Sequence, residues 1–215
     1  MIKAVIFDLW NTLIDPTHSN HALKEIEKTY NIPKKIYQTT VKKGLMTTPL
    51  HTTDDVNNYL KKEFGFNHVT REQLNNLDKI IEKDKIQVEL FEDAIPTLEC
   101  LSKDGYKIAL ISNAATFHKH PFYKFNLEKY FDYVCFSCDV GFWKPETEIY
   151  KLTLKELGLK PCETIMVGDN REKDALVPST LGMMGLHLDR DKKYPRTIQR
   201  IDSLYELTEI VKEKN

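Results

Sequence analysis

Short apolar segments alternate with helical patterns along most of the chain. Five of them, bounded by polar residues or glycine, are predicted to form strands: residues 3–7, 106–111, 133–137, 164–167 and 185–188. The first four are rich in Val and Ile, which is typical of strands buried on both faces of a parallel sheet, and the fifth has a weaker pattern. Because helical patterns separate the strands after about residue 90, the chain is predicted to adopt an α/β fold with a Rossmann-like parallel sheet.

Three helical patterns in this part of the chain carry signals at their ends: residues 92–104, 145–157 and 202–212. Gly105 and Gly158 directly follow the first two patterns, and glycine is the residue that most often ends a helix. Pro145 opens the second pattern at a position that suits the first turn of a helix. Ser203 and Glu206 form a capping-box pattern at the start of the third.

Residues 16–88 differ from the rest because they contain helical patterns and no convincing strand. Thr70 and Gln73 form a second capping-box pattern, followed by apolar residues at positions 74, 77, 80 and 81. An all-helical insertion of roughly 70 residues is several times longer than an ordinary loop. We therefore expect two domains: an α/β core made of residues 1–15 and 89–215, and a helical domain of residues 16–88.

The composition is that of an ordinary globular protein. The 215 residues include 31 basic and 32 acidic side chains, so the net charge is −1, and 41% of residues are hydrophobic. Balanced charge gives no basic face for nucleic acid, and no apolar run approaches the roughly 20 residues of a membrane span. We expect neither nucleic acid nor a membrane as a partner.

The cysteines predict a reducing compartment. The four cysteines are accompanied by no cleavage-site signature at the start of the chain, so we expect free thiols and a cytoplasmic location. Cys135 and Cys138 have the spacing of half a zinc site, but no second pair is present to complete it. They are interpreted as two small thiols at the end of a strand.

Polar residues follow the predicted strands, where ligand sites of open α/β sheets lie. They are Asp8 after the first strand, Ser112 and Asn113 after the second, Lys144 past the third, and Asp169 after the fourth with Asp174 one helical turn later. Each alone is common turn or capping chemistry. Together they supply a carboxylate nucleophile, a hydroxyl donor, a cation and further carboxylates, which phosphoryl transfer through an aspartyl-phosphate requires.

The order of these motifs resembles the haloacid dehalogenase (HAD) superfamily of hydrolases. The motifs are Phe7-Asp8-x-x-x-Thr12, then Ser112, then Lys144-Pro145, then Gly168-Asp169-x-x-x-x-Asp174. The helical insertion after the first motif is similar to the cap domain of that family, so the resemblance spans the whole chain. It is specific for the superfamily and much less so for one reaction, because the same fold hosts many chemistries.

The resemblance implies a nucleophile and a metal site. Asp8 would be the nucleophile that is transiently phosphorylated. Asp8, Asp169 and the backbone carbonyl of Trp10 would hold Mg²⁺, a hard cation that prefers oxygen ligands. A backbone carbonyl is present with any side chain, so the tryptophan does not affect this ligand.

The same resemblance implies the residues that handle the substrate. Ser112 would donate a hydrogen bond to an oxygen of the transferring phosphoryl group, and Asn113 would contribute to substrate binding. Lys144 would neutralise charge on the nucleophile and on the phosphoryl group. Asp174 would orient Lys144 or a metal-bound water.

The chain departs from the family pattern at Trp10. Phosphatases of the family carry an aspartate there that protonates the leaving group, whereas an indole exchanges no proton at working pH. General acid–base catalysis is typically worth about 10²–10⁴-fold. Asn11 replaces the usual glycine and still suits a turn, because Asn tolerates the left-handed conformation. Asp15, His18 and His21 are other candidate acids, although each is more typical of a surface or hinge position.

Three functions fit these observations. The first is a Mg²⁺-dependent phosphatase of small phosphorylated metabolites, slow on poor leaving groups. The second is a metal-free carbon–halogen hydrolase resembling the 2-haloacid dehalogenases, favoured by the aromatic Trp10, by Asn113 and by Trp143. Against it stand the Gly168-Asp169 motif and the absence of an arginine before Arg71. The third is a weakly active scaffold that binds a phosphorylated ligand. The phosphatase is the main prediction, and either a monomer or a homodimer is compatible with it.

Overall fold

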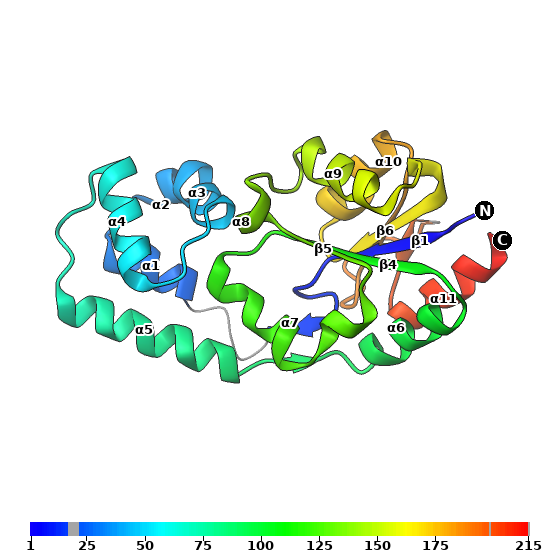
Figure 1. The fold of residues 1–215 in the computed structure, drawn as a ribbon, viewed down its shortest axis with the longest axis horizontal. Coiled ribbons are helices and arrows are strands. Elements are labelled where there is room, and N and C mark those ends of the chain that lie inside the picture. Colours follow the sequence, from blue (N-terminus) through cyan, green and yellow to red (C-terminus); the bar gives the residue numbers. More distant parts are fainter. Residues whose placement is uncertain (17–21, 198, 215) are drawn as a thin grey trace.

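The computed structural model describes residues 1–16, 22–197 and 199–214 (Figure 1). Its core is a six-stranded sheet in the order β5-β4-β1-β6-β7-β8, and all neighbouring strands are parallel. The strands are β1 (Ala4–Phe7), β4 (Lys107–Ser112), β5 (Tyr133–Phe136), β6 (Thr164–Gly168), β7 (Met184–Leu188) and β8 (Arg200–Ile201). All five predicted strands are present, so the predicted α/β fold is confirmed. The short β8 was not predicted.

Helices cover both faces of the sheet (Figure 1). The helices of this part of the chain are α6 (Ala94–Lys103), α7 (His120–Lys124), α8 (Ser137–Val140), α9 (Thr147–Leu157), α10 (Val177–Thr180) and α11 (Leu204–Glu213), and α8 lies beyond the end of β5 toward the helical segment. Short turns of 3-10 or π-helix lie at Thr116–Lys119, Leu127–Tyr130, Pro161–Glu163 and Arg171–Leu176. Val5 and Phe7 pack in the cluster formed with α6 and α11, whereas Ala4 and Ile6 pack in the cluster formed with α9. The alternation along β1 therefore explains why the strand is apolar throughout.

The helix ends were predicted in part. Gly105 and Gly158 follow α6 and α9 with φ of +82° and +69°, as expected of glycine after a helix. The first-turn position predicted for Pro145 is wrong, because α9 begins two residues later at Thr147.

The capping box predicted for α11 is also wrong. The side chain of Ser203 caps nothing, and the N–H of Leu204 donates instead to Oδ2 of Asp93 at 2.8 Å. Glu206 accepts a hydrogen bond from the N–H of Asp202 at 2.8 Å. A carboxylate more than a hundred residues away in the sequence therefore takes the place of the local cap.

The helical segment between β1 and α6 has its own apolar core. It contains α1 (Ala22–Thr29), α2 (Lys34–Ile36), a π-helical turn (Tyr37–Val41), α3 (Lys42–Thr47), α4 (Thr53–Phe64) and α5 (Arg71–Ile86). The predicted capping box at Thr70 and Gln73 is confirmed, and Leu74, Leu77 and Ile81 are buried behind it. These side chains belong to a hydrophobic cluster separate from those of the sheet.

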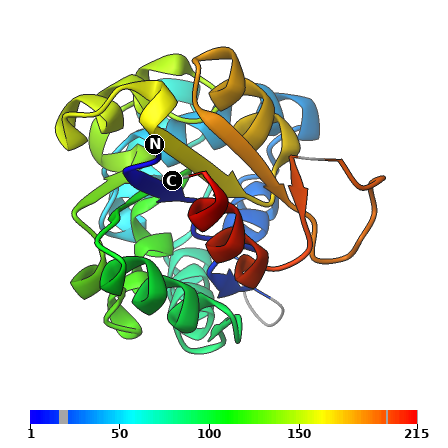
Figure 2. The ribbon, with the colours of Figure 1, turned by 90° about the vertical axis from the view of Figure 1, so that its right-hand side faces the viewer.

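Two short strands stand at the ends of this helical segment. β2 (Ile14–Asp15) pairs antiparallel with β3 (Glu89–Leu90), a pairing that the sequence did not predict. The strands of the main sheet run toward the helical segment, and the two chain termini lie together at the opposite end of the molecule (Figures 1 and 2). The carboxyl ends of the strands therefore face α1–α5.

None of the helices in the described part of the chain is long and apolar enough to cross a membrane. All four cysteines are free, and Cys135 and Cys138 are buried at the end of β5 and at the start of α8.

Candidate active site

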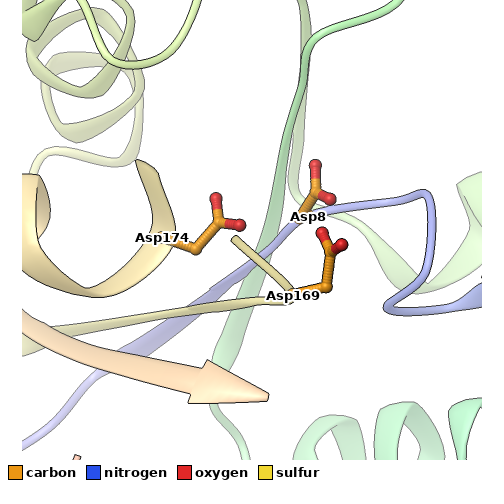
Figure 3. Close-up of side chains that lie close together, drawn as sticks. All are labelled: Asp8, Asp169 and Asp174. Carbon is orange, nitrogen blue, oxygen red and sulfur yellow. The ribbon is translucent and has the colours of Figure 1, made fainter. Parts of the chain in front are cut away.

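Three aspartates meet at the carboxyl edge of the sheet, two directly after neighbouring strands and one in the turn beyond β6. Asp8 directly follows β1, and its N–H donates to the carbonyl of Val167 in β6 at 2.9 Å. Asp169 follows β6, and Asp174 lies in the π-helical turn beyond it. Carboxylate oxygens of the three residues lie within 4.8 Å of one another (Figure 3). The structure thus brings together carboxylates that the sequence placed at separate strand ends.

Gly168 makes this close approach possible. A Cβ at this position would lie 2.4 Å from Oδ2 of Asp174 and 2.8 Å from Cβ of Asp8. Any larger residue would displace one of the two carboxylates. The glycine of the Gly168-Asp169 pair is therefore required by packing.

Lys144 joins two of the carboxylates. Its Nζ lies 2.7 Å from Oδ1 of Asp8 and 2.6 Å from Oδ1 of Asp174. The second oxygen of Asp174 accepts a hydrogen bond from the N–H of Asn170 at 3.0 Å. Lys144 and Asp174 are buried, and each oxygen of Asp174 has a partner, one in Lys144 and the other in the backbone of Asn170.

The charges of this cluster do not balance. Three carboxylates and one ammonium leave a net charge of −2 when all are ionised. Burial raises the pKa of Asp8 to about 7 against the lowering by Lys144, and burial with Asp174 raises that of Asp169 to about 6. Although burial alone would lower the pKa of Lys144, Asp174 and Asp8 hold it above its usual value, so the lysine stays charged. A divalent cation would restore neutrality, and carboxylate oxygens are the ligands that Mg²⁺ prefers.

Ser112 carries a buried hydroxyl at the end of β4. The residue is 1% exposed, and its Oγ finds no hydrogen-bond partner among the described residues. An unpaired buried hydroxyl costs about 1–3 kcal/mol, so such groups are rare unless a ligand completes them. The predicted hydroxyl donor is thus buried without a partner in the described part of the chain, and its contact with a phosphoryl oxygen stays a prediction.

Asn113 contacts the backbone of Lys144. Its side-chain Nδ2 donates to the carbonyl of Lys144 and its Oδ1 accepts from the N–H of Lys144, both at 2.7 Å. This pair of hydrogen bonds fixes the main chain that carries the lysine. The structure therefore shows Asn113 positioning Lys144, and its part in substrate binding stays a prediction.

The turn after β1 has the conformation expected from its sequence. Asn11 has φ of +58°, so the interpretation that asparagine replaces glycine in a left-handed turn is confirmed. Within the described turn no backbone N–H donates to the carbonyl of Trp10, which leaves this oxygen available as the predicted cation ligand. The indole Nε1 of Trp10 is buried without a partner, and the ring contacts His118 edge-on at 5.7 Å.

The structure separates the candidate acids. Asp15 lies in β2 and lines a cavity of about 570 Å³ together with Asp169. His18 and His21 lie outside the described residues. His118 was not predicted as a site residue, because only the fold brings residue 118 against Trp10.

His118 is buried as a neutral ring. It is 5% exposed and packs against Phe117 with ring centroids 4.5 Å apart. Burial lowers its pKa to about 4 from 6.5, despite the opposing charge of Asp84. At neutral pH the ring is therefore a neutral imidazole and not the imidazolium that acts as a general acid.

The burial of His118 should make the unfolding free energy depend on pH. Because the unfolded chain binds a proton at His118 near pH 6.5 and the folded protein only near pH 4, stability falls as the pH drops between these values. The unfolding free energy of the wild type should fall between pH 7.5 and pH 5. In His118→Phe this fall should be smaller by about 2 kcal/mol. Urea unfolding of both proteins at the two pH values measures it. The exposed-site control His51→Phe should behave as wild type, and an unchanged pH dependence in His118→Phe would contradict the neutral buried ring.

Comparison with known proteins identifies the family. The family model for haloacid dehalogenase-like hydrolases matches residues 2–178. The chain therefore belongs to the haloacid dehalogenase-like hydrolases, and it is a hydrolase built on their α/β fold.

Several relatives are similar over the whole chain. A glyceraldehyde 3-phosphate phosphatase of Methanocaldococcus jannaschii is 28% identical, with 99% of this chain and 98% of the relative aligned. A crystal structure of a HAD phosphatase from Thermococcus onnurineus has a TM-score of 0.65 at 26% identity and covers 98% of both chains. A 2-haloacid dehalogenase from Pseudomonas syringae has a TM-score of 0.67 at 21% identity and covers all of both chains, which shows the shared fold alone.

Proposed function

We propose that the protein is a Mg²⁺-dependent phosphatase of small phosphorylated metabolites that acts through a phosphorylated Asp8. The observation that carries this proposal is the bridge from Lys144 to Asp8 and Asp174 beside Asp169, a cluster whose charge calls for a divalent cation. The unpartnered hydroxyl of Ser112 supports it. The M. jannaschii relative, named a glyceraldehyde 3-phosphate phosphatase, supports the substrate class.

The chain's own residues account for the transfer. The carboxylate of Asp8 attacks phosphorus, the bond to the ester oxygen breaks, and that oxygen leaves with the bonding electrons and takes a proton from water. Lys144 and the hydroxyl of Ser112 stabilise the charge on the phosphoryl oxygens. Water then hydrolyses the acyl phosphate on Asp8 and releases inorganic phosphate. Mg²⁺, held by Asp8, Asp169 and the Trp10 carbonyl, would supply further charge neutralisation.

Neither residue beside the turn after β1 can protonate the leaving group. Trp10 has no proton to give, and His118 is neutral at working pH. The departing oxygen therefore leaves without a proton from either residue. We propose that good leaving groups, such as aryl and acyl phosphates, react faster than sugar phosphates.

We further propose that residues 16–88 form a cap domain over a core of residues 1–15 and 89–215. The separate apolar cluster of α1–α5 supports this division, and so does the β2–β3 pair at its two ends. Such a cap would shield the carboxylate cluster from bulk water during transfer.

A hydrolysis panel with and without metal tests the proposal. The substrates are aryl phosphate, acyl phosphate, sugar phosphates and 2-chloropropionate. We expect phosphate release that EDTA abolishes and Mg²⁺ restores. Halide release that persists in EDTA would overturn the phosphatase in favour of a dehalogenase, and no turnover of any substrate would favour a binding scaffold.

The two carboxylates beyond β6 are expected to differ in metal binding. Both oxygens of Asp174 are held by Lys144 and by Asn170, whereas Asp169 is nearer the end of its strand. Asp169→Ala should therefore weaken Mg²⁺ binding more than Asp174→Ala does. Isothermal titration calorimetry of the two variants with Mg²⁺ measures the difference, and a reversed order would contradict the assigned ligands.

Lys144→Met should lower turnover of aryl phosphate by about 10²–10³-fold, the effect of losing one preorganised stabilising group. The variant also leaves buried carboxylates without their cation, so urea unfolding in excess Mg²⁺ must accompany the rates. Lys151→Met, at an exposed position in α9, is the matched control. Turnover within about twofold of wild type would show that Lys144 does not stabilise the transferring group.

A further inference from the structure

A cavity of about 360 Å³ lies between the helical segment and the carboxyl edge of the sheet. Four of its lining residues are sequence neighbours of the site residues. Trp10 is two residues after Asp8, Asn113 follows Ser112, Trp143 precedes Lys144, and Lys173 precedes Asp174. The cavity therefore adjoins the carboxylate cluster on the side of α1–α5.

Two lysines line this cavity, one from the helical segment and one from the core. Lys42 comes from α3 of the helical segment, and Lys173 comes from the turn beyond β6. Both are partly buried, and neither forms an ion pair with a carboxylate in the described part of the chain. The neighbouring Lys43 in α3, in contrast, forms an ion pair with Glu146 of the core. Two like charges thus share one cavity without a direct ion pair, although Asp169 of the adjoining carboxylate cluster attracts Lys173.

The electrostatics of the pair agree with this picture. Burial, followed by the positive charge of Lys173, lowers the pKa of Lys42. The Nζ of Lys173 lies 5.6 Å from the ring centroid of Trp143, a cation–π contact that places the ammonium without neutralising it. Placing two ammonium groups together is unfavourable in the free protein, and a bound anion would relieve the repulsion.

Trp10 and His118 also line this cavity, and each has a buried ring nitrogen without a partner. Nε1 of Trp10 and Nε2 of His118 form no hydrogen bond to any described residue. An indole N–H acts only as a donor, and it requires an acceptor when it is buried. The cavity therefore presents two cations, and an anionic ligand would neutralise them.

We propose that Lys42 and Lys173 bind a second anionic group of the substrate, so the preferred substrates are small phosphate esters that also carry a carboxylate or a second phosphate. This rests on the proposed function, because the phosphate that is cleaved must lie at Asp8. A cavity of about 360 Å³ is at the lower end of small-molecule sites, which suits a compact metabolite. Lys42 and Lys173 then select the substrate without taking part in the transfer.

Binding of inert phosphonates tests the proposal independently of turnover. Isothermal titration calorimetry in Mg²⁺ compares propylphosphonate, which has one anionic group, with 3-phosphonopropionate and ethane-1,2-bisphosphonate, which have two. We expect the wild type to bind a doubly anionic phosphonate at least about tenfold more tightly, the effect of gaining a charge-assisted hydrogen bond. Whichever of the two binds better identifies the second group as a carboxylate or a phosphate.

Variants assign the preference to the two lysines. Lys42→Met and Lys173→Met should each reduce the preference by about tenfold, whereas Lys42→Arg should keep it. Lys79→Met, at an exposed position in α5, is the control. Circular dichroism verifies that each variant is folded.

The outcomes separate the two proposals. Equal binding of all three phosphonates by the wild type would overturn the second anion site and leave the phosphatase standing. A preference that survives both methionine variants would also overturn the assignment to these lysines. Binding of none of the phosphonates, together with no hydrolysis of phosphate esters, would overturn the proposed function and the second anion site together.

Discussion

We expect Asp8→Asn to abolish hydrolysis of every phosphate ester, by on the order of 10⁴-fold or more, as removal of a covalent nucleophile does in other enzymes. An amide does not attack phosphorus and forms no acyl phosphate. The amide oxygen can still accept a hydrogen bond from Lys144, whose Nζ lies 2.7 Å from Oδ1 of Asp8. The variant therefore removes the nucleophile and leaves the surrounding contacts in place.

The same variant should not be destabilised. Because burial raises the pKa of Asp8 to about 7, its ionised form costs stability in metal-free protein, and the cost grows as the pH rises from about 4 toward 7. Asparagine avoids this cost, so urea unfolding in EDTA at pH 8 should show an unchanged or higher unfolding free energy. Asp104→Asn, at an exposed position, is the control for turnover. An active and folded Asp8→Asn protein would remove Asp8 from the role of nucleophile.

The sequence predicted the sheet because its strands are buried on both faces. All residues of β1, β4 and β6 are buried except Lys107. A short run that is apolar on both faces is typical of an interior strand of a parallel sheet. The strands that were missed, β2, β3 and β8, have two residues each and no pattern of their own. They form only because the fold brings their partners alongside.

The helix ends also divide into those with a local sequence signal and those that depend on distant residues. The capping box at Thr70 and Gln73 is local, and it was predicted correctly. At α11 a local capping pattern was present, but Asp93 accepts the hydrogen bond from Leu204 instead. A cap supplied by a distant residue leaves no signal within a short window of sequence.

The sequence predicted those residues of the candidate site that directly follow a strand. Parallel strands end at one edge, so Asp8, Ser112 and Asp169 had to lie near one another. The neutral ring of His118 and the cavity lysine Lys42 were not predictable, because each reaches the site through packing between segments far apart in the chain.

The largest gain of activity is expected from Trp10→Asp. The substitution would place a carboxyl group two residues past the nucleophile, where phosphatases of the family carry their acid. Protonation of the leaving oxygen matters most when that oxygen is a poor leaving group. We therefore expect turnover of sugar phosphates to rise by up to about 10²–10⁴-fold, and that of aryl phosphates to change little.

Trp10→Asn is the matched control for this prediction, because it loses the same indole contacts with His118 and supplies no proton. The indole is partly buried, so both variants leave a void and lose similar stability, and only the aspartate should gain activity. A series of phosphate esters of graded leaving-group pKa, measured for the three proteins, gives the dependence of turnover on the leaving group. The wild type and Trp10→Asn should show a steep dependence and Trp10→Asp a shallow one.

A shallow dependence in the wild type would mean that another residue, such as Asp15 or His18, already donates the proton. Halide release from 2-chloropropionate by the wild type would mean instead that the reaction needs no acid, because a halide leaves without a proton.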